Sequence, residues 1–163
     1  MITDVDADGT GAAKASAAKS SAAKSSAAKP GDGVPGADGT GTLLPELAID
    51  VTPTFVIAAA IATRDFQDVH HDRDRAVERG GKDIFINILT TTGLVQRYVT
   101  DWAGPEAIVR KIAIRLGVPC YAGDKLTFSG RGEWHGQECV VEVTGRCSLG
   151  DHVTGTVHIG RAP

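Results

Sequence analysis

The chain has 163 residues, a formal net charge of −3 and a sequence pI near 5.9. A surface without excess positive charge gives no reason to expect nucleic acid or an anionic membrane as a partner. No apolar run approaches the roughly 18 to 20 residues that a membrane span requires. The first residues, Met1 to Asp4, lack the basic flank and apolar core of a signal peptide. We therefore expect a cytoplasmic protein.

Residues 1–41 consist almost wholly of Ala, Gly, Ser, Lys, Asp and Thr. A segment with so few large side chains cannot bury a core of its own. Its Ala-Ala-Lys repeat has a spacing that matches neither an α-helical face nor a coiled coil. We predict a low-complexity, disordered arm over residues 1–41, followed by one domain over residues 42–163. The arm could serve as a solubilising segment or as a tether for an anionic partner.

Large aliphatic residues begin at Leu43 and continue to the end of the chain. The β-branched and aromatic run at 54–57 predicts a first strand. A polar loop follows, and then a short helix is expected over residues 71–79, ended by Gly80. These short elements precede the main pattern of the domain.

One long helix is predicted from Asn87, which is a good N-cap residue, to the helix-ending pair Gly104-Pro105. Apolar side chains recur in it at helical spacing, at Ile88, Thr92, Val95, Val99 and Trp102, with Leu94 and Tyr98 widening the stripe. A helix that is apolar over so much of its circumference is suited to being wrapped by a sheet.

Four runs with a period of two follow the helix and predict strands, because side chains alternate between the faces of a sheet. Their expected inner faces are 108, 110, 112, 114 and 116; 126 and 128; the odd positions from Cys139 to Cys147; and 153, 155, 157 and 159. Short turns between them favour antiparallel neighbours. We predict an α+β hot-dog fold, an antiparallel sheet wrapped around a central helix. His152 and His158 are then expected on the exposed face of the last strand.

The cysteines give no sign of a disulfide framework or a structural zinc site. Cys120, Cys139 and Cys147 form no Cys-x-x-Cys pair, and an odd number leaves one unpaired. We interpret them as small buried side chains. Adjacent histidines at 70 and 71, followed by acids, also lack the regular spacing of a metal loop. We expect no metal.

Ionisable residues concentrate in the loop 64–72, where functional residues often lie. A carboxylate at Asp65 and an imidazole at His70 could hold one water between them, one group taking a proton and the other delivering one. An isolated pair at this spacing is weak evidence, because Asp65 could equally cap a turn and His70 could be solvated.

The sequence Asp65-Phe66-Gln67-Asp68-Val69-His70, followed by the helical segment 94–102, resembles the motif and central helix of MaoC-like, R-specific enoyl-CoA hydratases. The resemblance covers about 120 residues, and it implies that Asp65 and His70 are the catalytic pair. The family motif has Asn and Pro where this chain has Gln67 and Asp68. Gln67 is therefore expected to have only a supporting role.

The resemblance also implies that backbone N–H groups at the start of the long helix polarise the thioester carbonyl. A helix N-terminus offers unpaired donors and a favourable dipole to developing negative charge. Here that end lies at Asn87 and Ile88, with Asn87 expected mainly as the cap. Basic side chains that could bind coenzyme A phosphates are Arg97, Arg110, Lys111, Arg115 and Arg131.

Segments 62–72, 81–85 and 98–105 closely resemble the small MaoC-like subunit of actinobacterial hydratases of cholesterol side-chain degradation. This implies hydration of the C17–C20 double bond of a steroid acyl-CoA, a pregnadiene-20-carboxyl-CoA, with coenzyme A as part of the substrate and no cofactor. It also implies a larger MaoC-like/DUF35 subunit in an α2β2 heteromer, through which a lipid-transfer-like aldolase docks. The alternatives are a hot-dog acyl-CoA thioesterase and a non-catalytic acyl-CoA-binding subunit.

Overall fold

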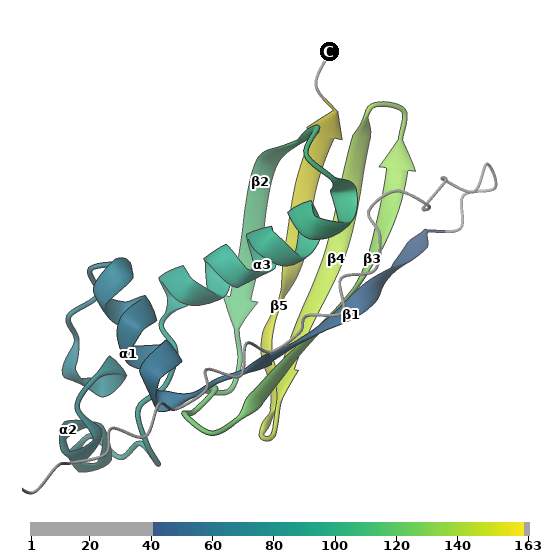
Figure 1. Ribbon diagram of the computed structural model, residues 1–163. Helices are drawn as coiled ribbons and strands as arrows, with labels where there is room; N and C mark the ends of the chain where they lie inside the picture. The colour runs from purple at the N-terminus through teal and green to yellow at the C-terminus, as the bar shows by residue number, and fades with distance from the viewer. Residues whose placement is uncertain (1–40, 162–163) are drawn as a thin grey trace, which may run out of the picture.

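The computed structural model describes residues 41–161 (Figure 1). In chain order the elements are β1 (Thr42–Asp50), α1 (Pro53–Ala62), the 3₁₀ turn η1 (Asp68–His70), α2 (Arg73–Glu78), α3 (Ile88–Ala103), β2 (Ala107–Leu116), β3 (Lys125–His135), β4 (Glu138–Cys147) and β5 (Gly150–Arg161). The disordered arm predicted for residues 1–41 falls outside the described residues except for Gly41. No helix within 41–161 is long and apolar enough to cross a membrane.

The strands form one antiparallel sheet of five strands in the order β1-β3-β4-β5-β2. Figure 1 shows α3 lying across one face of this sheet, with α1 near the N-terminal end of α3 and α2 below α1. This arrangement confirms the predicted hot-dog fold. The edges of the sheet are β1 and β2.

The core lies between α3 and the sheet. Val95 and Val99 of α3 are fully buried, and Tyr98 stacks on Phe128 of β3 with ring centroids 5.6 Å apart. A Cβ added at Gly132 of β3 would lie 2.6 Å from the Trp102 ring. Glycine at this position therefore lets a large aromatic side chain of α3 lie directly on the sheet.

The predicted strand at 54–57 is wrong, because these residues belong to α1. Thr52 caps this helix by accepting a hydrogen bond from Phe55 N at 3.1 Å, and Pro53 occupies its first position. Proline is favourable there because its missing N–H would have had no helical partner. The first strand is instead β1, whose inward residues include the buried Leu44.

The predicted inner face of β2 is correct only for Ile112 and Ile114. A register shift between Val109 and Lys111 leaves Arg110 as an extra residue opposite β5. Such a bulge reverses the alternation of the strand. Ala107 and Val109 therefore pack on the core before the bulge, and Ile112 and Ile114 do so after it. Ile108 and Leu116, expected inside, are 37% and 38% exposed.

Candidate active site

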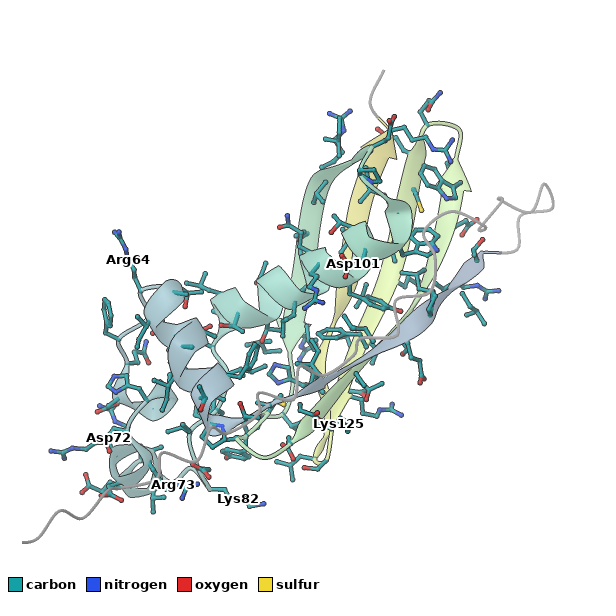
Figure 2. The ribbon with its side chains drawn as sticks, in the orientation of Figure 1. Arg64, Asp72, Arg73, Lys82, Asp101 and Lys125 are labelled. Carbon is teal, nitrogen blue, oxygen red and sulfur yellow. The ribbon has the colours of Figure 1, made fainter. Side chains whose placement is uncertain are left out.

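Asp65 is placed by the C-terminal cap of α1. Arg64 N donates to Ile61 O at 3.1 Å and Asp65 N donates to Ala60 O at 2.9 Å. These two bonds, with Arg64 at a φ of 55°, form a Schellman motif, in which the left-handed position is usually glycine. The Arg64 side chain points away from the fold (Figure 2). This cap ends α1 and turns the chain, so it fixes the position of Asp65 at the start of the following loop.

His70 ends η1 and is only 6% exposed. Its Nδ1 lies 2.8 Å from Phe85 O, and its ring meets the Phe85 ring edge-on with centroids 5.0 Å apart. Because a carbonyl oxygen can only accept, Nδ1 carries the proton in the neutral imidazole. Nε2 then has a free lone pair.

That lone pair faces Asp65. His70 Nε2 lies 3.5 Å from Asp65 Oδ2, and the two side chains are 7% and 16% exposed. The distance is too long for a strong direct hydrogen bond, but one water can contact both atoms. The fold thus brings together the two residues that the motif singled out, in a largely enclosed position.

Gln67 is exposed, and its contact with Asp65 is made by the backbone. Gln67 N donates to Asp65 Oδ1 at 3.4 Å, whereas the Gln67 side chain has no hydrogen bond within residues 41–161. The bond from the backbone helps to hold the carboxylate in place. Any residue except proline could supply it.

Asn87 is the N-cap of α3, as predicted. Its Oδ1 accepts from Thr90 N at 2.8 Å, and its Nδ2 donates to Thr63 Oγ1 at 2.8 Å. The N–H groups of Ile88 and Leu89 have no partner within the described range. Two backbone donors at the N-terminus of α3 are therefore free within the described residues. The Asn87 side chain links this end of the helix to Thr63 at the end of α1.

Several large apolar side chains stay exposed on the elements that carry the site. They are Ile61 at 59%, Phe66 at 69%, Ile88 at 51% and Leu89 at 52%. Isolated exposed apolar residues are common, but four of them on α1, the Asp65 loop and the start of α3 favour contact with an apolar ligand or another chain.

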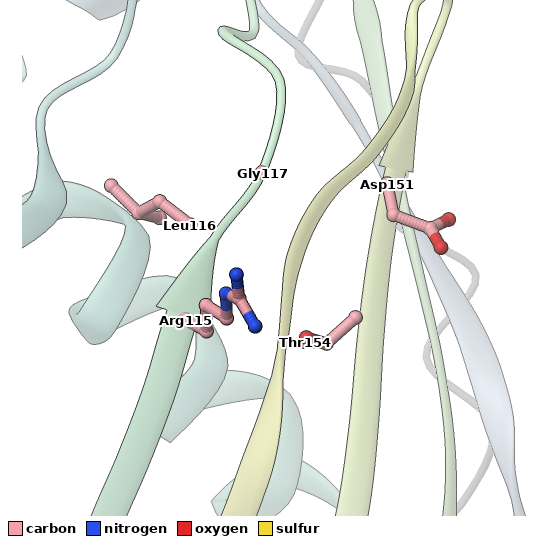
Figure 3. Close-up of a pocket in the computed structure, with 5 residues that line it drawn as sticks. All are labelled: Arg115, Leu116, Gly117, Asp151 and Thr154. Carbon is pink, nitrogen blue, oxygen red and sulfur yellow. The ribbon is translucent and has the colours of Figure 1, made fainter.

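Within residues 41–161, none of the contacts of the basic candidates for coenzyme A phosphates involves Asp65 or His70. Arg97 pairs with Asp101 at 3.3 Å, and Arg131 donates to Gly41 O at 3.1 Å. Arg115 lines a hollow of about 340 Å³ at the end of β2, and neither Asp65 nor His70 lines this hollow (Figure 3). The other residues of this hollow are Leu116, Gly117, Asp151 and Thr154.

Sequence reasoning missed His152, which is 2% exposed rather than solvated. Gly145 pairs with Val153 and Arg146 pairs with Asp151, so His152 is the extra residue of a bulge between β4 and β5. The bulge turns this side chain to the inside. His152 contacts Thr91 in the first turn of α3, with 2.9 Å between Nε2 and Oγ1.

The cysteines are buried, as predicted. Within residues 41–161, the ligand atoms of Cys120, Asp124 and Cys147 lie within 4.8 Å of one another. The Asp124 carboxylate already accepts hydrogen bonds from Ser148 Oγ at 2.6 Å and Tyr121 N at 3.1 Å. Burial raises the pKa of the Cys120 thiol, which keeps it protonated. This cluster is separate from the Asp65–His70 pair.

No family model matches the chain. The 3-oxo-4,17-pregnadiene-20-carboxyl-CoA hydratase beta subunit of Mycobacterium tuberculosis is 61% identical over 120 residues, which are 73% of this chain and 93% of that protein. A chain of the ChsH1-ChsH2 complex from the same organism superposes with a TM-score of 0.73 at 59% identity, covering 76% of this chain and 98% of that one.

A more distant structure has the same fold. The (R)-hydratase from A. caviae involved in PHA biosynthesis superposes with a TM-score of 0.69 at 16% identity, covering 76% of this chain and 96% of that one. The high identity to the mycobacterial subunit over almost its whole length goes beyond fold. The chain belongs to the family of the pregnadiene-carboxyl-CoA hydratase beta subunit, a MaoC-like hydratase with a hot-dog fold.

Proposed function

We propose that this chain is the catalytic subunit of a steroid enoyl-CoA hydratase. Its reaction is the addition of water across the C17–C20 double bond of a pregnadiene-20-carboxyl-CoA, giving the 17-hydroxy acyl-CoA. The observation that carries the proposal is the enclosed Asp65–His70 pair, in which His70 Nε2 and Asp65 Oδ2 lie 3.5 Å apart. The chain that holds this pair is 61% identical to the pregnadiene-carboxyl-CoA hydratase beta subunit.

The pair acts on one water. Oxygen of this water forms the new bond to C17 while one of its protons passes to Asp65 or to Nε2 of His70. The electrons of the double bond move toward the thioester oxygen, and the proton taken from the water is then delivered to C20, which returns the pair to its starting state. Such acid–base assistance contributes typically about 10²- to 10⁴-fold in rate. Gln67 supports the site by its backbone N–H to Asp65.

The start of α3 stabilises the charge that develops on the thioester oxygen. The N–H groups of Ile88 and Leu89 are unpaired within the described residues, and Asn87 holds this helix end against Thr63. Donors aimed at developing negative charge are worth most in a site from which water is excluded. No cofactor enters this mechanism, because coenzyme A is part of the substrate.

A second subunit completes the enzyme. Strand β2 lies at a sheet edge, and an exposed edge together with exposed apolar side chains needs a cover. The partner that the resemblance implies is a larger MaoC-like/DUF35 subunit in an α2β2 heteromer, through which a lipid-transfer-like aldolase docks. The ChsH1-ChsH2 structure, itself a complex, supports a heteromeric partner. A cytoplasmic location, expected from the sequence, stays a prediction.

The test is co-purification of the chain with this larger subunit, followed by turnover of the steroid enoyl-CoA and of crotonyl-CoA. Loss of the absorbance of the conjugated double bond reports hydration, and free thiol reports a thioesterase. We expect hydration of the steroid substrate only with the partner present. A stable homodimer that prefers crotonyl-CoA would remove the steroid assignment. Release of free thiol, or no reaction, would remove the hydratase itself.

A further inference from the structure

We infer that His152 is a positioning residue for this active site, acting through Thr91 on the first turn of α3 and on the loop that carries Asp65. The inference rests on the proposed function, because the elements it fixes are those of the proposed site. His152 lies on β5, far along the chain from both.

The hydrogen-bonding roles of His152 follow from its partners. Nδ1 lies 2.7 Å from Val118 O, which can only accept, so Nδ1 carries the proton. Nε2 is then an acceptor for the Thr91 hydroxyl at 2.9 Å, and the one proton of this hydroxyl is shared with Asn87 O at 3.1 Å. Burial lowers the pKa of His152, which favours this neutral form. Each ring nitrogen therefore has one partner, and the ring is held from both sides.

A continuous set of hydrogen bonds leads from Thr91 toward Asp65. Thr91 N donates to Asn87 O at 3.0 Å, and Asn87 Nδ2 donates to Thr63 Oγ1 at 2.8 Å. Thr63 Oγ1 donates in turn to Ala59 O at 2.8 Å in the last turn of α1. Asp65 follows directly from that turn. His152 thus holds the start of α3 against the sheet, and the start of α3 is in turn hydrogen-bonded to Thr63, the cap residue that precedes Asp65.

The arrangement matters because the donors of Ile88 and Leu89 act only if they point at the thioester oxygen. Catalytic groups must be held within about 0.5 Å of their productive positions by surrounding contacts. A displacement of about 1 Å, caused by a change away from the reacting atoms, can cost about 10²-fold in rate. Within residues 41–161, His152 makes the side-chain hydrogen bond between α3 and the sheet.

The first experiment compares three variants of the full chain in complex with the partner subunit. Thr91→Val keeps the side-chain shape and removes the hydroxyl, and it is expected to lower kcat by about 10- to 100-fold with little change in KM. Thr91→Ser keeps the hydroxyl and should restore most of kcat. Thr100→Val is the matched control, since the Thr100 hydroxyl bonds only to carbonyls of α3 itself, and it should turn over normally.

A second set separates positioning from loss of stability. Thr91→Val leaves Nε2 of His152 buried without a partner, whereas Thr91→Val combined with His152→Leu removes that nitrogen but also the donor to Val118 O, so it should recover only part of the melting temperature. We expect kcat to stay low in the double variant. Recovery of kcat together with stability, or normal kcat in Thr91→Val, would overturn the positioning role. Normal turnover in Asp65→Asn would instead overturn the proposed active site.

Discussion

His70 Nε2 lies 3.5 Å from Asp65 Oδ2, while Nδ1 of the same ring is bonded to Phe85 O. The direction of the imidazole is therefore set by the segment between α2 and α3, which is itself paired to the loop before β3. Ile86 N donates to Cys120 O at 3.2 Å, and Ala122 N donates to Ile84 O at 2.9 Å. The Asp65–His70 pair thus depends on contacts from three separate parts of the chain.

Removing either member of the pair should stop the reaction without unfolding the protein. Asp65→Asn and His70→Ala are each expected to lower kcat by about 10²- to 10⁴-fold, because each removes a proton-transfer group from the shared water. The double variant should be little worse than either single one, since both groups act as a unit. Steady-state turnover of the steroid enoyl-CoA checks this, with circular dichroism confirming the fold.

Matched controls lie in the same loop. His71 is exposed and adjacent to His70, and its Nε2 lies 3.2 Å from Phe66 O, so His71→Ala tests an imidazole that contacts the same loop but not the Asp65 carboxylate. Gln67→Ala keeps the backbone N–H that contacts Asp65 and should have a smaller effect than either catalytic change. Near-normal turnover in Asp65→Asn or in His70→Ala would contradict the mechanism, as would a loss in His71→Ala equal to that in His70→Ala.

Arg64→Gly should stabilise the protein. Arg64 has a φ of 55°, a conformation that costs a residue with a Cβ about 1–2 kcal/mol and glycine much less. Part of this gain is offset by the larger entropy of glycine in the unfolded chain. We expect a net increase of about 0.5–1 kcal/mol in the free energy of unfolding, measured by urea denaturation. A loss of stability would contradict the assigned cap geometry.

The central helix and most of the sheet could be predicted because local signals agree with the tertiary structure there. Asn87 caps α3 as expected, and the alternation from Cys139 to Cys147 matches the buried positions of β4. Helix α1 could not be read from periodicity, because its apolar residues run almost without interruption. The Thr52-Pro53 start was the available signal.

The features that escaped prediction depend on strand register. Gly145 and Arg146 of β4 pair with Val153 and Asp151 of β5, so His152 is an extra residue between the two pairs. Because of this bulge, the His152 side chain points inward. Nothing in the local sequence marks this bulge, since it arises from the pairing of two strands. The Asp65–His70 contact differs, because the residues lie close in sequence and the family motif identified them. The packing of Phe85 against His70 became evident only from the fold.

Removal of the first 40 residues should leave the enzyme intact. A chain that begins at Gly41 retains all of β1 and the carbonyl that accepts from Arg131. The removed segment lacks the large side chains needed for a core, so turnover and melting temperature should be unchanged. Calorimetry and co-purification with the larger subunit check this. Weaker partner binding by the shortened chain would assign the arm a tethering role.

The stability of the fold should fall at mildly acidic pH through His152. Burial lowers the pKa of His152, and the hydrogen bond to Val118 O opposes this shift only in part. The same side chain in the unfolded protein titrates near its ordinary pKa of about 6.5. Between the lower folded pKa and that value, the unfolded state binds more protons. The free energy of unfolding therefore rises with pH in this interval.

The contribution of His152 is fully present above pH of about 6.5 and is lost as the pH falls toward the folded pKa. The groups facing the ring, the Thr91 hydroxyl and the Val118 carbonyl, do not titrate, and Asp151 pairs with Arg146. Urea denaturation at several pH values between 5 and 8 gives the free energy of unfolding as a function of pH. This free energy should rise more steeply with pH in the natural chain than in His152→Leu, by at most about 1.4 kcal/mol per pH unit. Equal dependence of the free energy of unfolding on pH in the two proteins would contradict the lowered pKa of His152.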